Sequence, residues 1–296
     1  MHTKLKLMAA LALVAGLGNA ANAQIVTDVV VLDGAGNTIA NNVRSFDWNE
    51  AGSGLAVSFT PVVGSVFTFL YQANVVGFND AVGQPIIPLS GLNSSFASGG
   101  YEFTVAARIT ETVTSVATVA GITTVTFAAT GGTASIFFDN AASGGVKSVT
   151  STGAGFDDGR LVGQFGITAG SGVSNFTTFA DGTGIGATSY DFTVSAGTTV
   201  DAAYLQGVLG PIGDLHFTSS QVLPAGTSLT SAFHTGTPAN ATDIYPTTLV
   251  GINLLIKVDG SNVFTTAGAV PEPETYALML AGLGFMGFMT RRRRKA

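Results

Sequence analysis

The feature that most limits the folds open to this chain is an alternation of apolar and polar residues with a period of two. In residues 101–113 the odd-numbered positions are mostly apolar and the even-numbered ones mostly polar. An extended strand places alternate side chains on opposite faces, so this segment is predicted to be a half-exposed β-strand. The same pattern predicts further strands at Ser65–Val76, Thr123–Ala129, Ala134–Asp139, Leu161–Ile167, Ser189–Ser195, Asp214–Phe217 and Leu249–Val258.

Glycine-containing pairs separate these segments. Gly accepts the positive φ that tight hairpin turns require, so each pair predicts a turn. Many short strands joined by such turns are typical of an antiparallel sheet protein. The sequence therefore predicts an all-β body at residues 24–269, an antiparallel β-sandwich with jelly-roll-like connections. The predicted turns are Asp33-Gly34, Gly99-Gly100, Gly131-Gly132, Gly144-Gly145, Asp158-Gly159 and Asp181-Gly182.

The first 23 residues have the pattern of a signal peptide. Two lysines, Lys4 and Lys6, precede an apolar run that favours a helix, and Ala21 and Ala23 supply the small residues of a cleavage site. Signal peptidase is thus expected to cut before Gln24, after the Sec machinery has exported the chain.

Residues 270–296 form a second unusual segment. Val-Pro-Glu-Pro-Glu at 270–274 favours an extended backbone, because Pro fixes φ and keeps the preceding residue out of the helical region. The apolar residues 276–290 predict a short transmembrane helix of about 22 Å, followed by a basic cluster that resists translocation and stays cytoplasmic. The alternative is a buried core helix with a solvated basic tail.

This C-terminal order resembles that of bacterial PEP-CTERM proteins. The resemblance implies that exosortase, a membrane cysteine transpeptidase-like enzyme, cuts near the motif, so that the inner membrane holds the protein only transiently. It also implies an association with exopolysaccharide and biofilm or floc formation. The matching residues are Pro271, Glu272 and Pro273 of the motif and Arg291, Arg292, Arg293, Arg294 and Lys295 of the basic cluster.

Parts of the body are similar to flocculation-associated PEP-CTERM proteins. That similarity implies a role in cell aggregation and extracellular polymer, and it assigns no site residues. The segments that carry it are FDWNEAGSGLA (46–56), YQANVVGFN (71–79), YEFTVAARITETVTSV (101–116), ASIFFDN (134–140) and GFDDGRLVGQFGI (155–167).

Charge and cysteine content exclude several functions. Residues 24–269 contain five basic and sixteen acidic residues, a net charge of −11. Coulomb repulsion from such a surface opposes binding to nucleic acid. The chain contains no Cys, which removes disulfides, thiol redox chemistry and thiolate metal sites.

Histidine and tryptophan offer few candidates for chemistry. Asp214 and His216 share one face of a predicted strand, where an acid–imidazole pair positions a base or a metal, although a strand-face hydrogen bond is the favoured interpretation. His234 is expected in a loop. The single Trp48 lies between polar residues, as in sugar-binding surfaces, but a core position is favoured.

Asp157 and Asp158 form the densest acidic point of the body, and adjacent carboxylates suit calcium. Their spacing does not match an EF-hand loop, so a plain hairpin turn is favoured and no cofactor is predicted, with Ca²⁺ as the alternative.

The resulting expectation is a non-enzymatic, exported and exosortase-processed protein of the cell surface or extracellular matrix, which promotes flocculation or biofilm formation with exopolysaccharide. A secreted polysaccharide-active enzyme on a β-sandwich is the first alternative. A structural subunit that self-assembles through exposed strand edges is the second.

Overall fold

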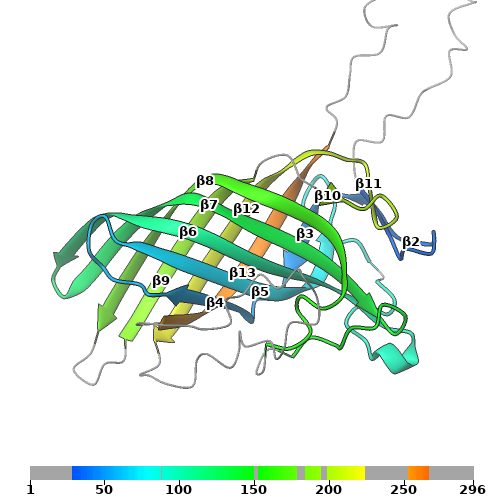
Figure 1. The fold of residues 1–296 in the computed structure, drawn as a ribbon, viewed down its shortest axis with the longest axis horizontal. Helices are drawn as coiled ribbons and strands as arrows, with labels where there is room; N and C mark the ends of the chain where they lie inside the picture. Colours follow the sequence, from blue (N-terminus) through cyan, green and yellow to red (C-terminus); the bar gives the residue numbers. More distant parts are fainter. Residues whose placement is uncertain are drawn as a thin grey trace, which may run out of the picture. The chain divides into compact units, whose positions relative to one another are not determined.

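A computed structural model describes residues 29–87, 89–149, 153–178, 184–194, 199–223 and 253–266. All of them belong to one compact unit, Thr27–Val270, drawn in colour in Figure 1. The predicted signal peptide with Ala21 and Ala23, the sorting segment 270–296 with its helix and basic cluster, and His234 lie outside the described residues.

The described chain is built from strands and one 3-10 turn, η1 (Phe96–Ser98). Three short strands form a small sheet in the order β11-β1-β2, and the others form a large antiparallel sheet. The strands are β1 (Val29–Leu32), β2 (Thr38–Val43), β3 (Ser45–Trp48), β4 (Gly52–Val57), β5 (Val66–Asn79), β6 (Tyr101–Val119), β7 (Ile122–Asn140), β8 (Arg160–Thr178), β9 (Gly184–Val194), β10 (Thr199–Val200), β11 (Leu205–Gln206), β12 (Val208–Leu223) and β13 (Asn253–Thr266).

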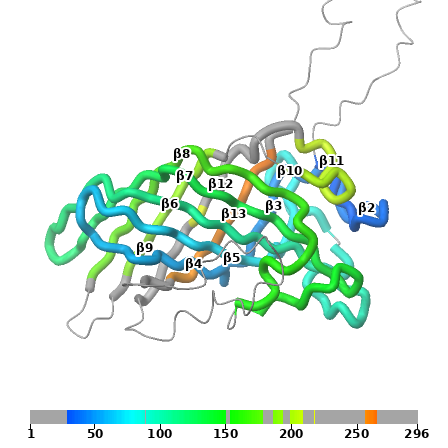
Figure 2. Tube along the Cα trace, viewed as in Figure 1, coloured from blue at the N-terminus to red at the C-terminus, as the bar shows by residue number. Residues whose placement is uncertain are grey.

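The large sheet closes on itself. From β5 to β9 each strand pairs with the next along the chain, and β9 pairs with β12, which pairs with β13. β13 then returns to β3 and β4, and both of these pair with β5. The trace in Figure 2 follows this up-and-down path, with β10 continuing the line of β9 along β8.

The prediction of an all-β antiparallel body is confirmed. Jelly-roll-like connections are not found between the described strands, because β5 to β9 pair in the order of the chain and the sheet closes where β13 pairs with β3 and β4. A period-two pattern identifies strands and faces, but it carries no information about which strands pair.

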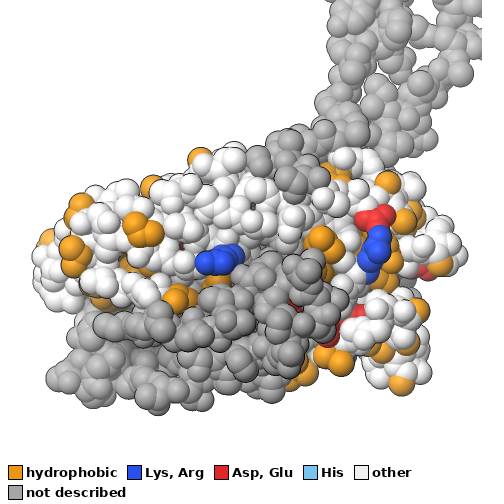
Figure 3. Space-filling view, viewed as in Figure 1, with side chains coloured by type: hydrophobic (Ala, Val, Ile, Leu, Met, Phe, Trp, Pro, Cys, Tyr) orange, Lys and Arg blue, Asp and Glu red, His pale blue; other side chains and the backbone are white. Residues whose placement is uncertain are grey.

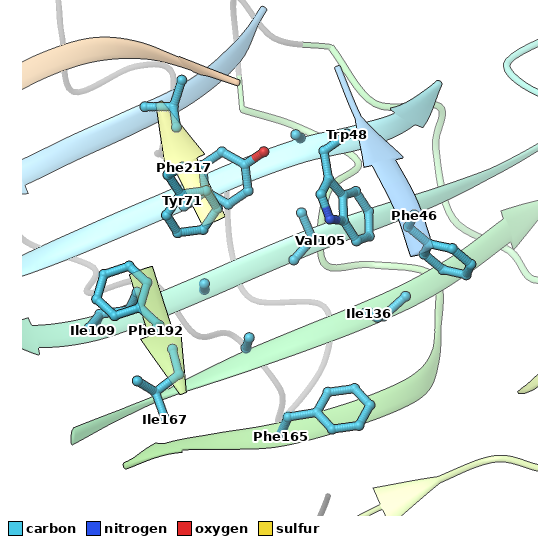
Figure 4. Packing of buried hydrophobic residues seen from close by; sticks show 14 of the residues in the cluster. Phe46, Trp48, Tyr71, Val105, Ile109, Ile136, Phe165, Ile167, Phe192 and Phe217 are labelled. Carbon is cyan, nitrogen blue, oxygen red and sulfur yellow. The ribbon is translucent and has the colours of Figure 1, made fainter. Parts of the chain in front are cut away.

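The interior is filled by aromatic side chains from opposite walls, so the packing remains sandwich-like. Phe69 of β5 stacks on Tyr190 of β9 with ring centroids 4.9 Å apart, and Tyr71 of β5 lies 4.2 Å from Phe217 of β12. Figure 4 shows the Tyr71–Phe217 pair and, further along, Trp48 near Phe46. Burial of these rings is the main apolar stabilisation of the closed sheet.

The two faces of β6 are as predicted from Arg108 to Val113. Ile109 and Val113 are buried in the interior, whereas Arg108 is exposed. Near the start of the strand both faces are buried. Thr104 on the outer face donates to the Phe156 carbonyl (2.8 Å), so the segment before β8 covers this end.

The Gly131-Gly132 turn is wrong, because both residues lie within β7, which replaces the two predicted strands. A Cβ built on Gly132 would come within 2.5 Å of the Arg108 carbonyl oxygen of β6. The pairing of β6 and β7 also shifts register between Thr110 and Glu111. Gly132 therefore permits a close backbone approach beside an irregularity, a role that glycine has in strands as well as in turns.

One acid faces the apolar interior. Glu111 of β6 is fully buried, and neither carboxyl oxygen has a hydrogen-bond partner among the described residues. Burial raises the pKa of Glu111 well above its ordinary value, and this carboxyl in turn raises the pKa of the buried Tyr190 hydroxyl, whose own burial is the larger cause. The folded protein therefore favours the neutral form of Glu111 more than the unfolded chain does.

The free energy of unfolding is expected to fall as pH rises from about 4.5. The folded state holds the Glu111 proton more tightly than the unfolded chain, so this stability is complete below the unfolded pKa and is lost as pH approaches the raised folded pKa. Glu111→Gln should remove that pH-dependent component. The measurement is urea unfolding of both proteins between pH 5 and 9, and identical pH profiles would contradict a buried, protonated Glu111.

Candidate pocket at the loop end of the closed sheet

A pocket of about 880 Å³ lies where the small sheet meets the loops that flank β7 and β8. Four separate segments line it, so only the folded chain brings its side chains together. We call it the loop-end pocket, and its lining comprises Asp33, Gly34, Ala35, Asn140, Ala142, Ser143, Asp158, Gly159, Arg160, Leu161, Thr199 and Tyr204.

The β1–β2 turn forms one side of the pocket and is held by Asp33. Its Oδ1 accepts hydrogen bonds from the backbone N–H of Ala35 (2.8 Å) and Asn37 (3.0 Å), and its Oδ2 accepts one from the Asn37 side chain (2.7 Å). These bonds, the side-chain bond from Asn37 first, lower the pKa of Asp33. The carboxylate is ionised at neutral pH and fixes the predicted Asp33-Gly34 turn.

Tyr204 supplies the aromatic surface of the pocket. Its ring packs on Phe138 with centroids 5.1 Å apart, and a Cβ built on Gly34 would come within 2.4 Å of the ring. Its backbone carbonyl accepts from the Leu32 N–H (2.8 Å). Gly34, with a φ of +79°, thus serves both the turn and the close approach to Tyr204. The ring is held in place before any ligand arrives.

An ion pair fixes the cation of the pocket. Arg160 Nη2 donates to Asp201 Oδ2 at 2.9 Å, and Asp201 Oδ1 accepts from the Ala203 N–H at 3.0 Å. The bond from Arg160 is the largest cause of the lowered pKa of Asp201. Arg160 is well exposed, so solvent screens the pair, and its main effect is to balance the charge of the guanidinium.

The loop after β7 is held by the buried Asp139 and the half-buried Asp158. The Asp139 carboxylate accepts from the Ser143 hydroxyl and from the Asn140 N–H (2.8 Å), and Asp158 accepts from the Val146 N–H (3.0 Å). Burial, with smaller contributions from Asp158 and Glu102, raises the pKa of Asp139 to about 6.

Glu102 holds the next part of the same loop. Its carboxylate accepts from the Ser148 N–H (2.7 Å) and hydroxyl (2.8 Å) and pairs with Lys147 at 3.4 Å. Three carboxylates thus accept hydrogen bonds from groups of this loop. Without these donors the buried acids would be left unsatisfied, so the hydrogen bonds hold the loop wall of the pocket in place.

The structure brings few of the sequence candidates together. Asp158 lines the loop-end pocket, whereas Asp157 is buried beside it. Trp48 is a core residue, as favoured, and its Nε1–H donates to Asn262 Oδ1 at 2.8 Å. His216 lies on β12 opposite Asp191 and Ser261, and the side chains of Asp214 and His216 are not among those described. In the described part of the chain, no group of three or more acidic or histidine side chains is placed to hold a metal ion.

Sequence reasoning missed Tyr204, Arg160 and Asp201 as site residues. None has a local motif, since each becomes part of the site only through strand pairing between distant segments. The one usable signal was the pair of predicted turns, Asp33-Gly34 and Asp158-Gly159, which both border the pocket.

The fold and site together define an all-β, antiparallel protein with a preformed polar pocket at one end. The family model for the PEP-CTERM protein-sorting motif matches residues 269–294, and the chain therefore carries the sorting signal of exosortase substrates. This motif implies export, processing by exosortase, and placement at the cell surface or outside the cell.

Comparison with curated proteins and with solved structures gave no match for this chain. Across the described segments, no helix has the length and hydropathy needed to cross a bilayer.

Proposed function

We propose that this exported surface protein promotes flocculation or biofilm formation by holding a matrix exopolysaccharide in the loop-end pocket. The observation that carries the proposal is the pocket itself, in which the fixed Tyr204 ring lies among carboxylate, amide and hydroxyl groups. An aromatic face packs on the C–H patch of a sugar, and the polar groups bind its hydroxyls. The PEP-CTERM motif supports delivery of such a protein to the matrix.

The proposed role is binding without catalysis. Asp33 and Asp158 both line the pocket, which is the feature that favours the alternative, a polysaccharide-active enzyme. However, Asp33 accepts three hydrogen bonds within its own turn and has a lowered pKa, so it is a poor proton donor near neutral pH. Asp158 accepts from the loop N–H of Val146. Release of new reducing ends from the bound polymer would favour the enzyme.

Tyr204→Ala is expected to weaken retention of the cells' own exopolysaccharide by about five- to thirtyfold, because the apolar contact between a sugar and the ring face contributes on the order of 1–2 kcal/mol. Tyr204→Phe keeps the ring and should bind like wild type, although the hydroxyl is gone. The measurement is co-sedimentation of purified full-length protein with the isolated polymer, with thermal unfolding to check the fold. Equal retention by the Ala and wild-type proteins would remove Tyr204 from the site.

A further inference from the structure

The charges around the loop-end pocket discriminate between classes of sugar. Three charged side chains line it, Asp33, Asp158 and Arg160. The Arg160 guanidinium is already paired with the Asp201 carboxylate at 2.9 Å. The two aspartates therefore determine the electrostatic potential in the pocket, which is negative.

The surroundings add to this negative potential. Asp139, directly before the lining residue Asn140, is almost fully buried, and its Oδ2 has no hydrogen-bond partner among the described residues. Asp139 also interacts electrostatically with Asp158 and Glu102, and the whole body has a net charge of −11. A polymer of uronic acids would meet like charge both at a distance and in the pocket.

We infer that the loop-end pocket binds a sugar with a free ammonium group, so that the matrix polymer is an amino-sugar polysaccharide. This inference rests on the proposed function. An ammonium presents three N–H donors, and Asp33, whose oxygens accept three bonds within the turn, keeps an acceptor position on Oδ2. The Tyr204 ring beside it attracts a cation through its π face as well as packing on the sugar ring.

The test uses full-length protein and three oligosaccharides of equal length: glucosamine, N-acetylglucosamine and uronate oligomers. Titration calorimetry at low salt should give the tightest binding for glucosamine, weaker binding for the acetylated oligomer and none for the uronate. Binding of glucosamine should weaken as salt rises, because the charges lie near solvent.

Asp33→Asn removes one pocket charge and should weaken glucosamine binding about two- to fivefold, a larger loss than the same variant shows for the acetylated oligomer. Asp80→Asn is the matched control. Asp80 accepts from the N–H groups of Val82 (2.9 Å) and Gln84 (2.8 Å) in a turn of the same kind, yet it does not line the pocket. Both variants change the net charge of the protein equally, so a difference between their affinities for glucosamine reports the charge inside the pocket.

The outcomes separate the inference from the proposed function. Equal or tighter binding of the acetylated or uronate oligomer overturns the amino-sugar inference and leaves polysaccharide binding in place. Equal weakening by Asp33→Asn and Asp80→Asn overturns the role of the pocket charge. Failure of all three oligomers, together with failure of the native polymer, overturns the proposed function and the inference with it.

Discussion

Full-length protein is expected to accumulate in the inner membrane when Pro271, Glu272 and Pro273 are replaced together by Ala. Pro disfavours helix and favours an extended backbone that a membrane enzyme can reach, whereas Ala permits helix. Residues 276–290 and the basic cluster are unchanged, so insertion should be unaffected. Membrane fractionation with an antibody against the body would show nearly all the protein uncut, where wild type is processed.

The matched control changes the other part of the motif. Replacing Arg291, Arg292, Arg293, Arg294 and Lys295 by Ser should weaken cytoplasmic retention of the C-terminus, because each cation resists insertion by roughly 2.5–3.5 kcal/mol at a helix centre. This variant should be mis-sorted instead of retained intact in the membrane. Wild-type processing of the triple-Ala protein would mean that residues 271–273 are not the recognised motif.

Phe46→Ala is expected to lower the free energy of unfolding by about 3–5 kcal/mol. Phe46 is fully buried. Its ring centroid lies 4.8 Å from those of Phe78 and Phe264 and 5.7 Å from those of Trp48 and Phe103. Removing it leaves a cavity where β3, β5, β6 and β13 meet. Urea unfolding, followed by the fluorescence of the single tryptophan, would measure the loss.

Val76→Ala on β5 provides the comparison for this variant. Val76 is 45% exposed, so its truncation should change the free energy of unfolding by no more than about 0.5 kcal/mol. If both variants cost the same, the Phe46 cluster would not be the stabilising centre of the closed sheet.

Parts of β5 to β9, β12 and β13 were predictable because burial forces a period of two on the sequence, whereas β1 to β4, β10 and β11 were not predicted. The pattern even placed Glu111 on the same face as Phe103 and Ile109, although it could not show that this acid would be left without a partner. Strand order was not predictable, since the pairing of β13 with β3 and β4 joins residues about 200 positions apart. The Gly131-Gly132 pair misled for a physical reason, because Gly132 permits a close strand approach and glycine serves that role as readily as a turn.

The site was less predictable than the fold. Asp158 was singled out with its acidic neighbour, with a plain hairpin turn favoured and calcium as the alternative, and in the fold it accepts from the loop N–H of Val146. Tyr204 and Arg160 have unremarkable neighbours in the sequence and meet only after β8, β10 and the small sheet have assembled. By contrast, the sorting motif was readable, because it is a short, contiguous segment that can be identified without the fold.

The central claim is that the body, once sorted to the surface, aggregates cells through the loop-end pocket. The most direct measurement is flocculation of a strain that lacks the gene, complemented with wild type, Tyr204→Phe or Tyr204→Ala, with the surface amount of each protein determined in parallel. Wild type and the Phe variant should restore flocculation, and the Ala variant should reach the surface in equal amount without restoring it. Full flocculation with Tyr204→Ala, or in the strain without the gene, would contradict the claim.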